Sequence, residues 1–428
     1  MNQATDRRIA AALSLCTATG LVAVRWGAGL WGALGTDAPL WGLTTLDLCA
    51  GAPPLVPPLY PALVVALQLT GLTLVDAGWM VALAAAALVP AATFWAARTA
   101  GALRSTAIVA AVLAGLSPDL GAWAQQLQPD SLASLGMVLL GGIFAHQARQ
   151  PDARWPRLSL VILAGLWPLL REHGTALAAL IIVVLAVSPR GRRWAGGAAL
   201  AWWAGPLFVG VLPGLHPLDV PWAERSGGAL SALTAEGPDA VPYIRELHRE
   251  ARRAYLDLLT QHDRGGQVRW HLGRSLRLAA DGWAVVAVAA VGLLARRSRV
   301  LNRLALPILT VVPALLIWSQ RRHVMLALPL CLAVLAGCAP AHLRLRQAIV
   351  AVVGICVAVA HATLWPPVLR GLQTERPRAE HYAEVGTWIC ANHPDNALIG
   401  GIFQDVGLYC PRPRHDPDGT LADWHTVL

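Results

Sequence analysis

The sequence contains no lysine, so all 34 of its basic side chains are arginines. Charged residues make up 14% of the 428 residues, against about a quarter in an average soluble domain, so the chain is short of polar surface. The seven cysteines include no CxxC pair or metal-ligand spacing, and no glycine-rich nucleotide-binding loop is visible. An arginine-only composition rich in Ala and Leu is typical of GC-rich coding and indicates a bacterial source.

Hydrophobic residues account for 56% of the chain, and most of them lie in apolar runs suited to a hydrocarbon core about 30 Å thick. The runs are 9–30, 59–75, 78–97, 105–118, 131–145, 158–170, 174–188, 194–212, 276–295, 304–318, 324–339 and 347–365. The sequence therefore predicts an all-α polytopic membrane protein. The net charge of +9 lies in short loops between runs, which is typical of an orientation signal and not of a nucleic-acid partner.

The arginines also decide which runs span. Arg7 and Arg8 place the N-terminus in the cytoplasm. If every run crossed, four arginine-rich loops would lie outside: 98–104, 146–157, 189–193 and 296–303. Treating 59–75, which begins PPLYP, as a helix on the outer surface brings all four inside, together with 340–346. The prediction is about eleven transmembrane helices with a juxtamembrane helix in the first outer loop. A tight hairpin of two spans at 59–97 is the alternative.

This topology divides the chain into a transmembrane domain, 1–365, and an extracytoplasmic tail, 366–428. The tail is predicted to be a helix followed by a short strand, which makes a small α/β appendage. Long outer loops cover 31–77 and 213–274. In the second loop, 241–259 has the apolar spacing of a helix that lies in the headgroup layer or packs on its own domain. The predicted location is the inner (plasma) membrane, with the N-terminus cytoplasmic and the C-terminus extracytoplasmic.

Ionisable side chains gather where the predicted spans meet the outer face. Each costs about 2.5–3.5 kcal/mol at the bilayer centre and less at its edge, so these positions are candidates for function. The set is Asp37, Asp47, Asp119, Asp130, Arg171, Glu172, His173, Arg321, Arg322 and His323. Arginine binds phosphate through two parallel hydrogen bonds, and a carboxylate can take a proton from an attacking hydroxyl. The combination indicates chemistry on a phosphate-bearing lipid.

Six segments carry a resemblance to a known family. In chain order they are GTDAPLW, PPLYPAL, FWAARTAGALR, LAGLSPDLGAWAQQLQPDSLASL, LAGLWPLLREHG and SQRRHVMLALPLCL. In this order and sidedness, residues 1–345 resemble the GT-C superfamily of glycosyltransferases, which use polyprenyl-phosphate-linked sugars. The closest branch contains the protein O-mannosyltransferases, the lipid A aminoarabinose transferase and the rhizobial core galacturonosyltransferases. The resemblance implies an inverting hexosyl- or pentosyltransferase. Its implied partners are the membrane, a polyprenyl-phosphate sugar donor and a lipid or glycan acceptor of the cell envelope.

The resemblance also assigns roles to acids. Asp37 is the candidate catalytic base, with Asp47 in reserve, although Ala38 stands where the family commonly has a second acid. A solvated loop carboxylate is the alternative for both aspartates. Asp130 is expected to help position the donor phosphate or a divalent cation, the one cofactor that the resemblance suggests. Because Asp130 follows Pro129 at a predicted helix start, it is also a candidate N-cap.

Three arginines complete the candidate site. The resemblance implies that Arg171, Arg321 and Arg322 bind the donor phosphate and offset the charge that develops on the leaving group. Anchoring to lipid headgroups is the alternative, because arginines near span ends snorkel toward the interface. His173 or His323 as a metal ligand has no second ligand at a fixed spacing to support it.

Cys390 and Cys410 lie in the predicted outer tail, where an oxidising compartment permits disulfides. We expect these two to pair, with Cys49 as a competing partner. Two other functional classes stay open at this point. A transporter or flippase of lipid-linked glycans would need charges midway along its spans, whereas these lie at the ends. A catalytically silent GT-C-like scaffold is the second, because Ala38 replaces the second acid.

Overall fold

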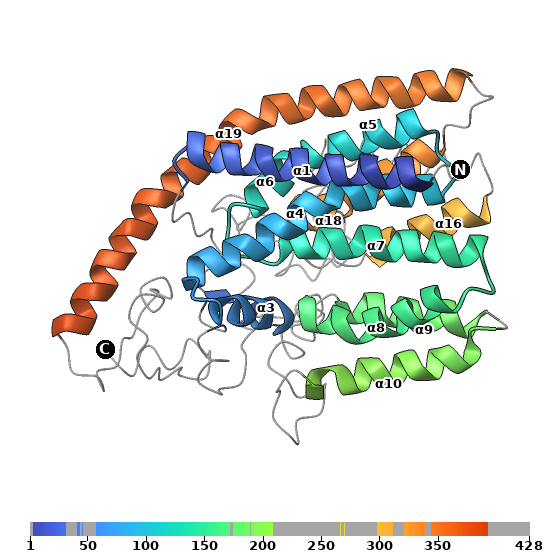
Figure 1. Cartoon of the computed structure of the whole chain (residues 1–428), viewed down its shortest axis with the longest axis horizontal. Helices are drawn as coiled ribbons and strands as arrows, with labels where there is room; N and C mark the ends of the chain where they lie inside the picture. The colour runs from blue at the N-terminus through green and yellow to red at the C-terminus, as the bar shows by residue number, and fades with distance from the viewer. Residues whose placement is uncertain are drawn as a thin grey trace.

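The computed structural model describes residues 3–30, 41, 42, 45, 57–171, 174–188, 190–208, 266, 269, 298–310, 321–338 and 344–392. Throughout this part of the chain the regular structure is helical (Figure 1). The helices are α1 (Gln3–Gly27), α3 (Leu59–Gln68), α4 (Leu74–Thr99), α5 (Arg104–Gly115), α6 (Pro118–Trp123), α7 (Asp130–Arg149), α8 (Arg154–Leu170), α9 (Gly174–Ala186), α10 (Arg192–Phe208), α16 (Arg299–Ala305), the 3₁₀ helix η2 (Leu306–Thr310), α18 (Arg321–Gly337) and α19 (Arg344–Asn392).

The helices pack side by side as a membrane bundle. α4 contacts α1, α5 and α7, and α8 contacts α9 and α10, with their axes running in one common direction (Figure 1). Among the described residues, four segments are long and apolar enough to cross a membrane: Ala4–Gly27, Leu74–Thr99, Asp130–Arg149 and Ala351–Thr374. The chain is therefore an integral membrane protein. The total of about eleven spans stays a prediction, because run 276–295 lies outside the described residues.

The N-terminus and the basic turns share one end of the bundle, the basal end. Asp6, in the first turn of α1, accepts hydrogen bonds from Nε of Arg98 at 3.3 Å and Nε of Arg104 at 2.9 Å. Arg149, at the end of α7, donates to the carbonyl oxygen of Thr99 at 3.4 Å. Figure 1 shows the α4–α5, α7–α8 and α9–α10 turns at this end. This clustering agrees with the charge argument, and which end faces the cytoplasm stays a prediction.

The later basic loops come to the same end. A Cβ atom added to Gly337, the last residue of α18, would lie 2.6 Å from Cδ2 of Leu301 in α16 and 3.2 Å from Cβ of Ala100 in the α4–α5 turn. The start of α16 and the end of α18 therefore lie beside that turn. The opposite end of the bundle, where α4 and α7 begin, is the distal end.

α4 has clear start and stop signals. The Thr73 side chain caps its first turn, because Oγ1 accepts a hydrogen bond from the backbone N–H of Asp76 at 3.2 Å. At the other end Gly101 has φ +87°, a conformation that side chains disfavour. Its N–H donates to Arg98 O at 3.1 Å, and Ala102 N–H donates to Ala97 O at 3.0 Å. This pattern is a Schellman motif, and it turns the chain back into α5.

α3 does not cross the bundle. Tyr60, in its first turn, donates its hydroxyl hydrogen to the carbonyl oxygen of Gly78 near the start of α4, at 3.1 Å. The last residue of α3 is joined to α4 by residues 69–73 alone, where Gly71 has φ +92°. Both ends of α3 thus lie near the start of α4. This placement is what a surface helix in 59–75 predicts, and two full spans at 59–97 would require the opposite.

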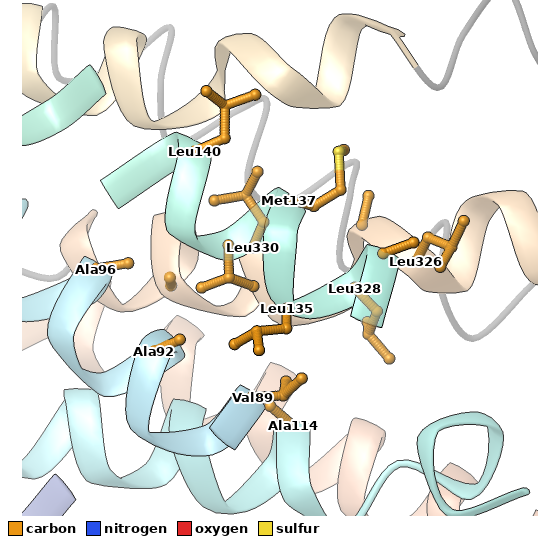
Figure 2. Close-up of a cluster of buried hydrophobic side chains, with 14 of the residues drawn as sticks. Val89, Ala92, Ala96, Ala114, Leu135, Met137, Leu140, Leu326, Leu328 and Leu330 are labelled. Carbon is orange, nitrogen blue, oxygen red and sulfur yellow. The ribbon is translucent and has the colours of Figure 1, made fainter. Parts of the chain in front are cut away.

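The core of the bundle forms where α4, α5, α7 and α18 meet. Figure 2 shows Leu326, Leu328 and Leu330 of α18 with Leu135, Met137 and Leu140 of α7 and with Val89, Ala92 and Ala96 of α4. All of these side chains are buried. Close approach depends on Gly141 of α7, where a Cβ atom would meet Leu330 Cδ1 at 2.5 Å and Leu304 O at 2.7 Å. Small residues at such seams let membrane helices pack at short range.

α19 runs across the predicted boundary between the transmembrane domain and the tail, and the division into two domains stays a prediction. The predicted span ends at 365, but the helix continues to Asn392 and bends along its length (Figure 1). Its 49 residues correspond to about 74 Å, more than twice the hydrocarbon thickness. Pro366 and Pro367 lie inside this helix and do not end it. Proline inside a helix is a known cause of bending. The strand expected in the tail lies outside the described residues.

The predicted topology determines which introduced cysteines a membrane-impermeant thiol reagent can label from outside the cell. Ser226→Cys and Asp418→Cys, in the predicted outer loop and tail, should be labelled above the background of the parent protein. Asp152→Cys should not be labelled in intact cells, although residue 152 lies at the basal end with 78% of its side chain exposed. Labelling at 152 but not at 226 would invert the topology and remove the catalytic assignment.

Candidate functional site at the distal end

Two predicted site residues form a buried ion pair at the distal end. Asp130 opens α7, and its carboxylate accepts a hydrogen bond at Oδ1 from Nη2 of Arg171, which follows α8. The Asp130 side chain is 1% exposed and that of Arg171 is 6% exposed. A buried ionic side chain is costly unless it is paired, and each of these two residues supplies the other's partner. Sequence spacing alone does not predict this pairing across two helices.

The N-cap role expected for Asp130 is wrong. The cap of α7 is Pro129, with no side-chain cap bond, and Asp130 is already inside the first helical turn. Its carboxylate bonds the guanidinium of Arg171, so that both partners of the hydrogen bond are charged. The predicted helix start is nevertheless correct to within one residue.

The turn after α8 fixes the backbone of Arg171. This residue is extended, with φ −151° and ψ 150°, and its N–H donates to Trp167 O at 3.2 Å. Its carbonyl oxygen accepts from Gly174 N–H at 2.8 Å, which closes the turn into α9. A Cβ atom at Gly174 would lie 1.9 Å from Trp167 O, so only glycine fits there. These two backbone bonds hold Arg171 at the end of α8, where its side chain meets Asp130 of α7.

The start of α18 reaches the same end. Ser134 Oγ of α7 donates to Leu326 O at 3.2 Å, and further along, Gly141 packs on Leu330. Residue numbers rise together in the two helices, so α18 runs parallel to α7. Arg321 and Arg322, the first residues of α18, therefore have their backbone at the distal end, where Asp130 lies. Their side chains lie outside the described part, and their contact with phosphate stays a prediction.

The first outer loop is anchored to α3. Asp37 and Asp47 lie outside the described residues, but Trp41 between them is described and buried. The Trp41 ring packs edge-on against that of Tyr60, with centroids 5.8 Å apart. Burial raises the pKa of the Tyr60 phenol, so the hydroxyl stays protonated and keeps its hydrogen bond to Gly78 O. Trp41, which lies between the two candidate bases in the sequence, is thus held against α3 at the distal end.

Tyr60→Phe tests this anchor. The substitution removes one buried hydrogen bond and keeps the ring, so we expect the protein to lose about 1 kcal/mol of stability. Thermal unfolding followed by tryptophan fluorescence measures the change. Thr70→Val is the matched control, since it removes a hydroxyl-to-carbonyl bond of 2.7 Å that is exposed at the end of α3. Equal effects of the two substitutions would contradict an anchoring role for Tyr60.

Sequence analysis misses Arg25, the largest charged side chain that is fully buried among the described residues. It lies near the distal end of α1, 1% exposed, with its guanidinium carbon 4.4 Å from the centroid of the Trp79 ring. Such stacking stabilises a cation away from water. The available signal is an arginine inside an apolar run, since a charge there is costly and marks a structural or functional position.

The Arg171 guanidinium bears on the divalent cation that the sequence leaves open for Asp130. It donates to Oδ1 of Asp130, and its positive charge would repel a metal ion placed beside it. Binding of a divalent cation by this protein stays a prediction. Within the described ranges, no cluster of three His, Cys, Asp or Glu side chains is arranged to hold a metal ion. Asp37 and Asp47 are outside those ranges, so this result concerns Asp130.

Cys390, near the end of α19, is disulfide-bonded, whereas Cys16 and Cys356 are free thiols exposed on the bundle surface. Its predicted partner, Cys410, lies outside the described residues. We expect a Cys390–Cys410 crosslinked peptide in a non-reduced digest analysed by mass spectrometry, and a stabilisation of about 2–4 kcal/mol from the bridge. A Cys49–Cys390 peptide would contradict the predicted pairing.

Comparison with known proteins identifies the fold. Three solved structures of the oligosaccharyltransferase AglB from Archaeoglobus fulgidus match 95% of this chain at 13–14% identity. The TM-score is 0.53 for the complex with an inhibitory peptide and a dolichol-phosphate, 0.53 for the form tethered to an acceptor peptide, and 0.51 for the apo form. This chain has the oligosaccharyltransferase fold.

The oligosaccharyltransferase fold agrees with the GT-C-like architecture expected from the sequence, whereas the branch stays a prediction. The chain spans 63–64% of the length of those archaeal proteins. No protein-family model and no curated protein matches the sequence.

Proposed function

We propose that this protein is an integral membrane glycosyltransferase that transfers one sugar from a polyprenyl-phosphate carrier to an extracytoplasmic acceptor. The acceptor class is a glycolipid or a glycan of the cell envelope. The observation that carries the proposal is the gathering of the Asp130–Arg171 pair and the arginine-bearing start of α18 at one end of the bundle. The oligosaccharyltransferase fold supports it, because structures with that fold hold a dolichol-phosphate or an acceptor peptide.

The distal end faces away from the cytoplasm in this proposal. The basic turns gather with the N-terminus at the basal end, and basic loops remain on the cytoplasmic side. The protein is then a multi-pass protein of the inner membrane, and its acceptor is reached from outside. The carrier enters from the bilayer with its phosphate at the level of the distal headgroups.

The proposed reaction is a single displacement with inversion. Asp37, or Asp47 in its place, takes the proton of the acceptor hydroxyl. The acceptor oxygen attacks the anomeric carbon as the bond from that carbon to the phosphate oxygen breaks. The electron pair stays on the departing polyprenyl phosphate, which gains negative charge.

Arginines stabilise that leaving group. Arg171 is held near the distal end by a buried carboxylate, and Arg321 and Arg322 begin α18 at the same end. Fixed positive charges in a site shielded from water lower the energy of a transition state in which negative charge develops. In the proposed site, the base lies on the first outer loop and the arginines lie at the ends of helices.

The test uses the purified protein in proteoliposomes with a panel of polyprenyl-phosphate sugars and envelope glycolipids. A transferase converts the sugar-loaded carrier to polyprenyl phosphate and yields a glycosylated acceptor. A flippase moves the intact carrier between leaflets and leaves the bond to phosphate unbroken. Binding of the carrier without either event would identify a scaffold. Either of these last two results would overturn the proposal.

A further inference from the structure

We infer that Arg171 takes the place that a divalent cation would occupy beside Asp130, so that Asp130 positions Arg171 for the donor phosphate and binds no metal. The inference rests on the proposed lipid-phosphate donor and deepens it. It changes one expected role, since the resemblance leaves a cation open for Asp130. Asp130 becomes a positioning residue, and Arg171 carries the positive charge.

The geometry favours a guanidinium at this position. Asp130 and Arg171 come from different helices and meet in a region almost closed to water. A metal ion needs several ligands, and among the described residues no cluster of three or more His, Cys, Asp or Glu side chains is arranged to hold one. A guanidinium needs only the one carboxylate, because its charge is permanent and its donors lie in a fixed plane.

The backbone makes the pair rigid on both sides. Asp130 is in the first turn of α7, behind Pro129, and Arg171 is held by two backbone bonds in the turn closed by Gly174. Trp167, one turn earlier in α8, packs on Gly136 of α7, where a Cβ atom would come within 2.9 Å of the ring. The α7–α8 seam below the pair is therefore tightly packed, and the guanidinium is set in place before a donor arrives.

A preset cation explains how an arginine can stabilise a leaving phosphate without reorganising during the reaction. An unpaired arginine at a helix end would sample many rotamers, and its ordering would weaken donor binding. The Asp130 carboxylate restricts those rotamers in advance. The carboxylate also offsets part of the charge of Arg171, so the donor phosphate meets the oriented positive end of the pair. Arg321 and Arg322, whose backbone lies at the same end, are proposed to add further positive charge.

The experiment compares metal binding with phosphate binding in the full-length protein. Electron paramagnetic resonance measures free Mn²⁺ and so gives the number of Mn²⁺ ions bound. Binding of a short-chain polyprenyl phosphate is followed separately by tryptophan fluorescence, once in EDTA and once in excess Mg²⁺. Asp130→Asn should bind as many Mn²⁺ ions as the parent protein and bind polyprenyl phosphate about tenfold more weakly. Asp152→Asn, which changes the exposed Arg190–Asp152 pair at the basal end, should alter neither quantity.

A double substitution shows whether Asp130 acts through Arg171. Arg171→Gln should weaken phosphate binding more than Asp130→Asn does, and adding Asp130→Asn to it should cause no further loss. Additive losses would mean that Asp130 contacts the ligand by another route, and a Mn²⁺ site lost in Asp130→Asn would mean that it is a metal ligand. Either result overturns the inference.

Arg171→Lys supplies a second variant should Asp130→Asn fail to fold. It keeps the buried charge and removes the planar fork, so it should weaken phosphate binding and leave the Mn²⁺ count unchanged. Failure of the parent protein to bind polyprenyl phosphate in EDTA and in Mg²⁺ would instead remove the proposed function. The Mn²⁺ comparison would still decide the role of Asp130 in that case.

Discussion

Asp37→Asn is expected to lower sugar transfer by about 10²–10⁴-fold, because the amide keeps the shape of the carboxylate and cannot accept the acceptor proton. The rate is measured as polyprenyl phosphate released in proteoliposomes at saturating donor. Thermal stability should change little, since the role assigned to Asp37 is chemical. Binding of polyprenyl phosphate should also persist, because the arginines at the distal end are assigned to the phosphate.

Arg322→Ala gives a contrasting pattern that identifies the base more sharply. Loss of a phosphate-binding cation should weaken donor binding as well as turnover, whereas loss of the base should affect turnover alone. Near-normal transfer by a folded Asp37→Asn protein would move the base to Asp47. If a substitution of Asp47 were also silent, the transferase proposal would give way to the scaffold.

Much of the fold could be predicted because the bilayer imposes a simple rule on composition. Apolar runs place α4, α7, α8 and α9 within a few residues of their observed bounds. Arginine counts also predict that 59–75 does not span, and the Tyr60–Gly78 hydrogen bond places both ends of α3 near the start of α4. Charge and hydropathy act through solvation alone, so they can be evaluated without knowing which helices touch.

Helix ends were harder to predict where proline was involved. The last predicted apolar run ends at 365, just before Pro366 and Pro367, yet α19 continues to Asn392 with a bend (Figure 1). Proline removes one backbone donor and clashes with the preceding turn, but a helix with other contacts can absorb that cost. Trp365 supplies such a contact, because its ring N–H donates to Leu116 O at 3.0 Å and its ring packs on Gly121.

The site illustrates what a sequence cannot contain. Asp130 and Arg171 are both predicted as donor-binding residues, but their ion pair depends on how α7 packs on α8. Helical periodicity predicts on which face of a helix a residue lies, but not which neighbouring helix packs on that face. Arg25 differs, because its signal is present in the sequence: it is a single charge inside the apolar run 9–30. Hydropathy averaged over the run does not reveal that charge.

Asp130→Ala is expected to destabilise the protein by about 3–5 kcal/mol, because it removes one partner of a buried ion pair. A loss of this size is a large part of the stability of a typical domain, so the midpoint of thermal unfolding should fall by several degrees or more. Tryptophan fluorescence in mild detergent measures the midpoint. Arg171→Ala should cause a similar loss of stability, because it leaves the buried Asp130 carboxylate without the Arg171 guanidinium.

Replacing both partners distinguishes a stranded charge from lost packing. The pair Asp130→Leu and Arg171→Met removes both charges and fills the space, so it should recover most of the stability that either alanine substitution loses. Asp152→Ala is the matched control, since it breaks an arginine–aspartate pair whose side chains are 64% and 78% exposed. Solvent screening limits such a pair to about 0–1 kcal/mol. Asp130→Ala should therefore cost much more stability than Asp152→Ala. Equal losses would mean that the Asp130–Arg171 pair is not shielded from water, and the proposed positioning of Arg171 would lose its basis.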